Sequence, residues 1–120
     1  MTAPATGTLA ASSPVFLHGA DIPWVRAGDG VKRQVLCWNG QVMLVRVVFA
    51  AGAEGPAHHH PHVQCTLVAS GRFELTIGGE TRELVAGDSF IVPSGVVHSA
   101  RALEAGELVD CFTPMREDFL

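Results

Sequence analysis

The chain has 120 residues, of which 48% are hydrophobic, so it is long and apolar enough for one domain with a substantial core. Its formal net charge of −4 and its eight scattered Lys and Arg residues exclude a basic nucleic-acid-binding surface, and they disfavour an anionic membrane as a partner. No apolar run reaches the roughly 18 to 20 residues that a membrane span requires.

The N-terminal residues are expected to lie outside the folded domain. Residues 1–14 are small and polar and contain no Lys or Arg, which predicts a frayed tail and not a signal peptide. The domain is then expected to span residues 15–120. Its first part, residues 15–26, has no clear place in a small barrel but carries Phe16 and Trp24. We expect this segment to cover a sheet edge or pack on a second copy, which predicts a homodimer.

Short strands and turns are predicted from residue 34 onward. Strands over residues 34–38 and 42–49 flank Asn39-Gly40, a pair that type I′ hairpin turns prefer because both residues can adopt positive φ. Alternating apolar and polar residues predict a half-buried strand around Phe73, Leu75 and Ile77. Further strands are expected at residues 80–85, 89–92, 98–102 and 107–112. Turns recur about every eight residues without a helical period, which predicts an all-β sandwich or barrel.

The three cysteines do not form a recognisable framework. Cys37, Cys65 and Cys111 are odd in number and lack the C-x-x-C spacing of a zinc knuckle. Buried free thiols in a reducing cytoplasm are therefore expected. Cys65 and Cys111 are close in sequence to candidate site residues, so an oxidation-sensitive site is the alternative.

Five of the six histidines fall in two places: His58, His59, His60 and His62 in one segment, and His98 after a Pro-x-Gly turn. Alternate residues of an extended chain share a face, so His58 and His60 can direct their imidazoles to one point. Imidazole is a ligand for zinc, copper, iron and nickel. The pattern therefore predicts a metal site in preference to a chance run of surface histidines.

The spacing around these histidines resembles the two motifs of the cupin superfamily. The matching residues are Gly52-x5-His58-x-His60-x3-Gln64-x6-Gly71 and Gly87-x5-Pro93-x-Gly95-x2-His98. Cupins usually carry Glu where this chain has Gln64, and Asn where it has Ala102. The resemblance implies an all-β, single-domain cupin barrel of the jelly-roll type.

The resemblance also implies one divalent transition metal (nickel, zinc, manganese, iron or cobalt), held by His58, His60, Gln64 and His98. The neutral amide oxygen of Gln64 would leave the ion more of its charge than a carboxylate would, making it a stronger Lewis acid. His62 is the alternative to Gln64, because it shares the parity of His60 and imidazole is the better donor. The motif spacing favours Gln64.

The C-terminal residues narrow the resemblance further. Residues 108–119 read Leu-Val-Asp-Cys-Phe-Thr-Pro-Met-Arg-Glu-Asp-Phe and resemble the D-x-F-[ST]-P-x-R-E-D-F ending of the KdgF-type cupins. Those proteins act on unsaturated uronate monomers released by pectin or alginate lyases, and they promote opening of the 4,5-unsaturated ring to the linear keto form. In that family the Asp, the Phe and the following Arg line the site, which implies Asp110, Phe112 and Arg116 here.

The residues themselves are compatible with these roles. Asp110 and Phe112 share one face of the expected last strand, and a carboxylate beside a bound substrate can move protons. The planar fork of Arg116 matches a carboxylate. The alternatives are a solvated Asp110, a core Phe112, and a surface ion pair of Arg116 with its acidic neighbours.

The resemblance therefore implies a KdgF-like enzyme of the lyase or isomerase type, whose partner is a small sugar acid. In that reaction the metal would polarise a substrate oxygen, Asp110 would move the proton, and Arg116 would hold the carboxylate. Two other functions remain open: a non-enzymatic small-molecule-binding cupin and a three-His iron dioxygenase.

Overall fold

The computed structural model describes residues 12–120, so the first eleven residues of the predicted tail lie outside the described part. Ser12, which follows them, forms an isolated β-bridge with Asn39. The elements in chain order are η1 (Gly19–Asp21), β1 (Val25–Gly28), β2 (Val31–Asn39), β3 (Val42–Phe49), β4 (Glu54–His58), β5 (Val63–Ile77), β6 (Glu80–Val85), β7 (Ser89–Val92), β8 (His98–Thr113) and η2 (Glu117–Phe119). Both helices of this part are single 3-10 turns, and neither could span a membrane.

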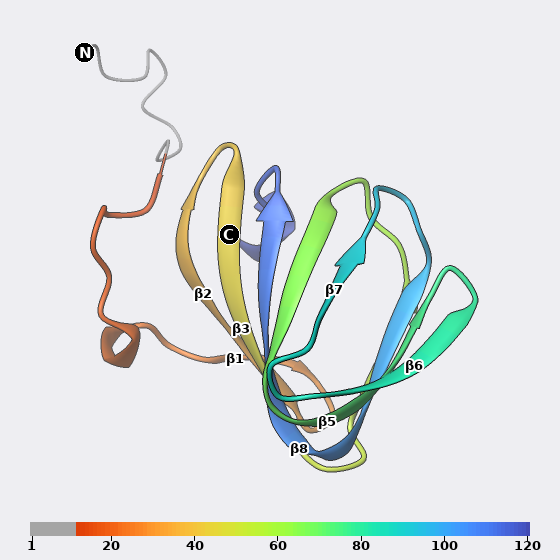
Figure 1. The fold of residues 1–120 in the computed structure, drawn as a ribbon. Coiled ribbons are helices and arrows are strands. Elements are labelled where there is room, and N and C mark those ends of the chain that lie inside the picture. Colours follow the sequence, from red (N-terminus) through yellow and green to blue (C-terminus); the bar gives the residue numbers. More distant parts are fainter. Residues whose placement is uncertain (1–11) are drawn as a thin grey trace.

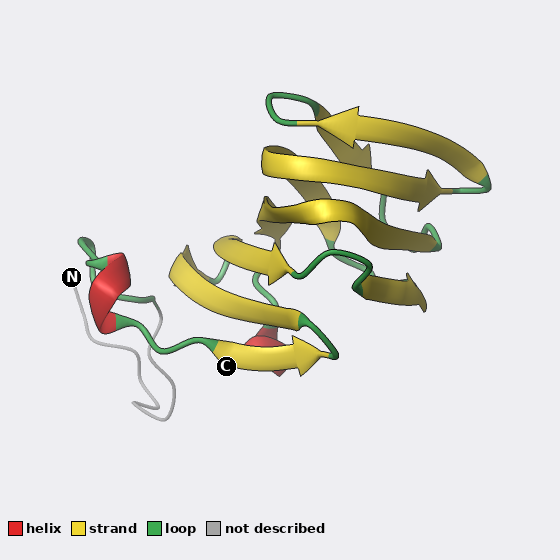
Figure 2. Cartoon of the chain, turned by 90° about the horizontal axis from the view of Figure 1, so that it is seen from below, coloured by secondary structure: helices red, strands yellow, loops and turns green. Residues whose placement is uncertain are grey.

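All eight strands belong to one antiparallel sheet that folds back on itself around a common interior (Figure 1, Figure 2). The order is β1-β2-β3-β8-β5-β6, while β4 pairs with β8 and β7 pairs with β5. In Figure 1, β8 begins in the layer that also contains β6 and ends in the other layer, where it pairs with β3. The predicted all-β barrel architecture is confirmed.

The two long strands, β5 and β8, bend together where Gly71 faces Gly106. A Cβ on Gly106 would lie 2.3 Å from the carbonyl oxygen of Ser70, and Gly71 has a φ of 82°. No side chain fits at this crossing. The two strands predicted at residues 98–102 and 107–112 are one strand, which corrects the prediction. Pairing continues through the bend at Arg72 and Glu104, so the chain does not leave the sheet there.

The turn between β2 and β3 differs from the predicted type I′ turn. Gly40 is not among the glycines with positive φ, and no described residue other than glycine has positive φ. Instead, the Asn39 side-chain oxygen accepts hydrogen bonds from the backbone N–H groups of Gln41 (2.8 Å) and Val42 (3.2 Å). The carboxamide therefore holds this turn, as in an Asx-turn. The Gly-Gly turn after β5 does have positive φ at both residues, 57° at Gly78 and 83° at Gly79.

Strands β3, β6 and β7 have the predicted bounds, whereas β1 and β4 were not predicted and β5 begins earlier than expected. The Glu-Gly-Pro-Ala-His sequence of β4 has little strand propensity, because Gly and Pro disfavour strands. The first half of β5 turns polar side chains, Gln64 and Thr66, toward the interior, which hides the alternation of apolar and polar residues. Both strands whose bounds differ from the prediction in this way, β4 and β5, lie beside the buried polar side chains of the barrel.

The interior has an apolar part and a polar part. Phe49 and Phe73 pack edge to face in the apolar part, with their ring centroids 5.2 Å apart. The polar part lies beside the smaller apolar cluster of Met43, Val45 and Phe112. Its buried polar side chains are those of His60, Gln64, Thr66, His98 and Asp110, whereas Gln34 is buried on the outer face of β2, where it donates to the carbonyl oxygens of Gly19 and Ile22. The apolar part holds the strands together, so the polar part can contain groups that contribute little to stability.

The cysteines are not buried as predicted. Cys37 and Cys65 are exposed and Cys111 is half-buried, and all three are free. The reason is the alternation of the strands: Cys65 follows the inward Gln64, and Cys111 precedes the inward Phe112. Cys65 and Cys111 are therefore register partners on the outer face of β5 and β8.

The close contact between β5 and β8 can be tested with alanine. Gly106→Ala should lower the free energy of unfolding by about 1–3 kcal/mol, because its Cβ would meet Ser70 and Gly71 at 2.3 and 2.8 Å. Gly40→Ala is the control: none of the described residues approaches that Cβ within 4 Å, and the change should stay within about 0.5 kcal/mol. Urea denaturation measures both, and equal effects would contradict a steric requirement at the crossing.

Candidate metal centre and substrate cavity

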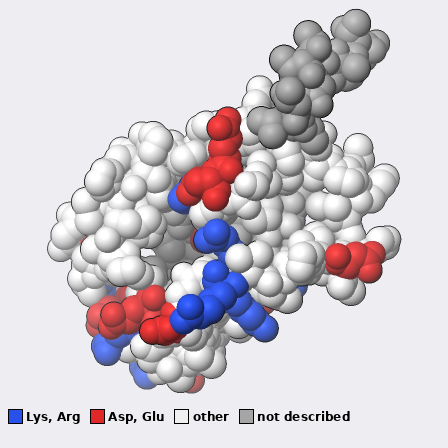
Figure 3. Space-filling view, turned by 180° about the vertical axis from the view of Figure 1, so that it is seen from behind, with Lys and Arg blue, Asp and Glu red and all other residues white. Residues whose placement is uncertain are grey.

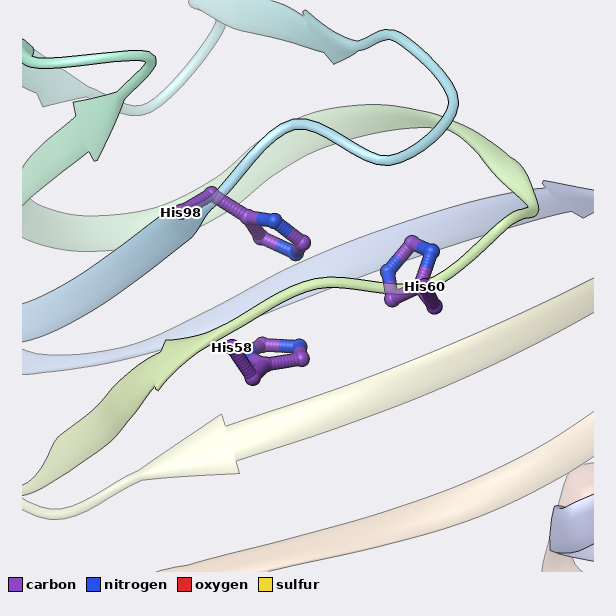
Figure 4. Close-up of side chains that lie close together, drawn as sticks. All are labelled: His58, His60 and His98. Carbon is purple, nitrogen blue, oxygen red and sulfur yellow. The ribbon is translucent and has the colours of Figure 1, made fainter.

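Three histidines meet inside the barrel and point toward one another (Figure 4). His58 ends β4, His60 follows in the next loop, and His98 begins β8, where it is the register partner of His58. The ring centroids of His58 and His98 are 4.2 Å apart, and those of His60 and His98 are 4.9 Å apart. One ring nitrogen from each residue lies within 4.8 Å of the others, so the cluster is capable of binding a metal ion.

Backbone carbonyls orient all three rings in the same way. Each Nδ1 lies 2.9 to 3.0 Å from a carbonyl oxygen and must donate to it, because a carbonyl can only accept. The accepting residues are Pro56, His62 and Val96. Each Nε2 is therefore left as an unprotonated lone pair, the form that binds metals. The Nε2 of His98 is buried without a hydrogen-bond partner among the described residues, and a cation at the cluster would satisfy it.

Gln64 brings an oxygen to the same place. Its Oε1 lies 3.1 Å from the Nε2 of His60, while its amide nitrogen donates to Thr66 Oγ1 (3.0 Å) and Asp110 Oδ1 (3.3 Å). Once the Nδ1 of His60 is protonated, both facing atoms are acceptors and repel each other unless a cation lies near both. The donor set therefore fits a divalent ion, and this geometry supports the prediction that Gln64 is the fourth ligand.

His62, the alternative to Gln64, has a different position. Its ring is not part of the three-histidine cluster, and its centroid is 5.6 Å from that of His60. Its carbonyl oxygen instead accepts the Nδ1 proton of His60. This geometry favours a role for His62 in orienting a ligand over a role as the ligand itself.

Burial keeps the inner histidines neutral. Desolvation lowers the pKa of His60 and of His98, and the positive charge of Arg116 lowers both further. A lowered pKa leaves the imidazole unprotonated at neutral pH, so protons compete less with a metal ion.

Asp110 is a buried carboxyl group beside this cluster. Its Oδ1 accepts a 2.6 Å hydrogen bond from Thr66 Oγ1, and its side chain faces the interior from β8. Burial raises its pKa to about 6, although the hydrogen bond from Thr66 and the charge of Arg116 act in the opposite direction. A carboxyl group with a pKa near neutrality can both accept and donate a proton in that range.

These groups share one cavity of about 410 Å³, which opens on the face shown in Figure 3. Its lining includes His58, His98, Gln64 and the three residues of the last strand and tail that the sequence singled out: Asp110, Phe112 and Arg116. Acidic and basic side chains gather at the edge of the hollow in that view. The cavity therefore brings a candidate metal centre, a carboxyl group and a guanidinium within reach of one small molecule.

Arg116 is held in the cavity wall by neighbours on three sides. Its Nε and Nη2 donate to the two carboxylate oxygens of Asp118 at 3.0 and 2.8 Å, and only 12% of its side chain is exposed. Its guanidinium also stacks on the rings of Phe112 (5.0 Å) and Phe119 (4.3 Å). The ion pair with Asp118, whose own side chain is 59% exposed, thus lies where the cavity meets solvent.

Three further residues of the site were not singled out in the sequence. Thr66 could have been found by parity, because it is two positions after Gln64 on the same strand face. Phe119 lies within the C-terminal motif, but nothing in the motif indicates that its ring reaches Arg116. Arg33 also lines the cavity, but in the sequence it is one of two adjacent basic residues in a strand and carries no recognisable signal.

Comparison with known proteins agrees with this geometry. The sequence profile of the family described as "Cupin domain" matches residues 45–110. The chain belongs to the cupin family. This cupin is 43% identical over 102 residues to the pectin degradation protein KdgF of Dickeya dadantii (strain 3937), which covers 83% of this chain and 93% of that protein.

Solved structures give the same relationship. KdgF from Halomonas sp. matches with a TM-score of 0.85 and 34% identity, over 90% of this chain and all (100%) of that one. An RmlC-like cupin from Shewanella frigidimarina NCIMB 400 matches with a TM-score of 0.89 and 40% identity, over 92% and 100%. The cupin fold and the resemblance to the KdgF-type cupins are confirmed.

The ligand set predicts which histidines are needed for metal binding. His58→Ala and His98→Ala should each abolish stoichiometric binding of a transition metal, measured by elemental analysis after dialysis, because each removes one of three converging nitrogens. His59→Ala is the matched control, since His59 is exposed and outside the cluster. Equal loss of metal in all three variants would reject the ligand assignment.

Proposed function

We propose that this cupin promotes the opening of 4,5-unsaturated uronate monomers to the linear keto sugar acid. The observation that carries the proposal is the single cavity, which joins the three-histidine cluster, the carboxyl group of Asp110 and the guanidinium of Arg116. The similarity to KdgF, a pectin degradation protein, supports a sugar acid as the ligand class. The cavity of about 410 Å³ has room for one monosaccharide.

Substrate binding would use the charged and aromatic wall of the cavity. The guanidinium of Arg116 is fixed by Asp118 and by stacking, so it loses little entropy when it receives a uronate carboxylate. The rings of Phe112 and His60 pack in a T-shaped arrangement with their centroids 5.6 Å apart, and Phe112 lines the cavity, where it would offer an apolar surface to the sugar ring. These contacts would place the hydroxyl groups of the sugar toward the histidines.

The reaction is an isomerisation that needs proton transfer and no other reagent. A divalent ion (nickel, zinc, manganese, iron or cobalt) held by His58, His60, His98 and Gln64 would supply Lewis-acid polarisation of a substrate oxygen. Asp110 would accept the proton of the anomeric hydroxyl while the ring carbon–oxygen bond breaks. It would then return a proton to the enol carbon, so that the linear keto acid contains the same atoms as the ring.

The hydrogen bonds to Asp110 suit this task. Thr66 and Gln64 both donate to the same oxygen, Oδ1, at 2.6 and 3.3 Å. Oδ2 takes part in neither of these bonds and can exchange a proton with the substrate. Thr66 therefore acts as a positioning residue for the carboxyl group.

Two substitutions separate proton transfer from binding. Asp110→Asn should lower kcat roughly a hundredfold or more with unchanged metal content, because the amide cannot take up the proton. Arg116→Lys should mainly raise KM and lower kcat/KM by about ten- to a hundredfold, because a point charge replaces a planar guanidinium that is fixed by its bidentate pair with Asp118 and still has N–H groups to donate to the ligand. Loss of the ultraviolet absorbance of the conjugated unsaturated uronate measures turnover.

Wild-type rates in both variants would contradict the assigned roles. Wild-type protein that binds uronates without turnover would instead be a small-molecule-binding module. Oxygen consumption with reduced iron, in the absence of ring opening, would identify an iron dioxygenase.

The proposed enzyme is a homodimer that uses the segment before β1. Val15 and Phe16 are 87% and 88% exposed, whereas Trp24 of the same segment lies beneath Lys32 and Arg46 of its own chain. Two adjacent apolar side chains with this exposure favour contact with a second copy.

Light scattering should therefore give about 25 kDa at micromolar concentration, twice the chain mass of 12.7 kDa. The double variant Val15→Ser/Phe16→Ser should shift the protein toward the monomer. Val97→Ser, at a loop residue that is 53% exposed, is the control and should leave the mass unchanged. A wild-type mass near 13 kDa would reject the dimer.

The cytoplasm remains the predicted location of this activity. Cys65 and Cys111 are register partners and both are free thiols. Reducing compartments keep such pairs in the thiol form.

A further inference from the structure

The guanidinium groups of two arginines lie over the ring of Phe119 in η2. The Cζ of Arg33 lies 3.8 Å from the ring centroid and that of Arg116 lies 4.3 Å from it. Arg33 comes from β2 and Arg116 from the segment after β8, and both line the cavity with Phe119. Two separate parts of the chain thus bring positive charges to one wall of the cavity.

The strand register directs Arg33 inward. Arg33 is two positions after Val31, a core residue, and it pairs with Val47 on β3. Lys32, the residue between them, lies on the other face, where its ammonium is 4.9 Å from the Trp24 ring. An arginine at an inward position is costly to desolvate, so its charge needs a compensating anion.

The two arginines differ in what already neutralises them. Arg116 has both hydrogen bonds of its fork satisfied by Asp118. Arg33 forms no hydrogen bond or ion pair with residues 12–120; its contact there is the ring of Phe119. Burial and the charge of Arg116 lower the pKa of Arg33, and Asp118 offsets this in part. Positive charge is therefore in excess on the Arg33 side of the wall.

We propose that Arg33 and Arg116 form a two-guanidinium site for the ligand's carboxylate, in which Arg33 supplies the unpaired hydrogen-bond donors. Stacking on Phe119 covers the faces of both guanidiniums and leaves N–H groups at their edges to donate. The ligand carboxylate would bind beside Asp118 without displacing it from Arg116. The identification of this ligand as a uronate rests on the proposed function.

A purely structural role for Arg33 makes a different prediction. Arg33 could act only by holding Phe119, and with it η2, against the cavity. Its loss would then weaken every ligand to a similar degree, whether or not the ligand carries a charge. Selectivity for the carboxylate therefore distinguishes a binding site from a structural contact.

The test compares saturated galacturonate with its neutral methyl ester by isothermal titration of the metal-loaded protein. Neither ligand contains the double bond, so binding is measured without turnover. Wild type should prefer the acid, and Arg33→Gln should weaken the acid by about ten- to a hundredfold while the ester changes less than about twofold. Arg33→Lys, which keeps the charge, should give an intermediate loss.

Two controls accompany these variants. Lys32→Gln removes a positive charge from the adjacent residue on the opposite face and should leave both affinities unchanged. Phe119→Leu removes the stacking surface, and thermal melting of each variant reports whether the fold is retained. Equal weakening of acid and ester in Arg33→Gln would overturn the proposal.

A wild type without preference for the acid would overturn it as well. Turnover of the unsaturated uronate is measured separately on wild type. Carboxylate-selective binding that depends on Arg33, without turnover, would leave this site established and reject the proposed enzymatic function.

Discussion

The antiparallel pairing of β5 with β8 is the constraint on which the rest of the structure depends. It runs from Val63 opposite Thr113 to Ile77 opposite His98, around a bend that only glycines can occupy. At one end it sets Gln64 and Thr66 against Phe112 and Asp110, and at the other it delivers His98 to the end of β4. Gln64 and His98 of the candidate metal centre and the buried carboxyl group of Asp110 are thereby positioned on two strands that pack around the apolar cluster near the bend.

Side chains point alternately inward and outward along these strands, so two neighbouring residues face different chemical environments. Cys111 lies between Asp110 and Phe112, yet it faces outward while both neighbours line the cavity. The same rule turns Cys65 away from the Gln64 amide. Residues with reactive side chains can therefore be close in sequence to the site residues and still face away from the cavity, so closeness along the chain does not favour an oxidation-sensitive site at Cys65 and Cys111.

The sequence predicted those parts of the site that occur at short, regular spacing. His58 and His60 are separated by one residue, and the C-terminal Asp-x-Phe keeps two side chains on one face; both patterns survive in any extended chain. The full length of β5 was hidden, because polar Gln64 and Thr66 occupy positions where alternation predicts apolar residues. The position of Arg33 in the cavity wall was not predictable, since it depends on a ring more than eighty positions away that reaches it only in the folded chain.

The polar interior also explains the division between stability and function in this fold. Desolvation of Asp110, His60 and His98 opposes their charged forms, and the compensating contacts are few: a hydroxyl, an amide and two backbone carbonyls. Such an arrangement costs stability unless a cation and an anionic ligand complete it. The converging Nε2 atoms fit the cation, and the guanidinium of Arg33, which has no hydrogen-bond or ion-pair partner among residues 12–120, fits the anion. The groups at the two ends of the cavity thus fit a ligand that carries oxygen donors at one end and a carboxylate at the other.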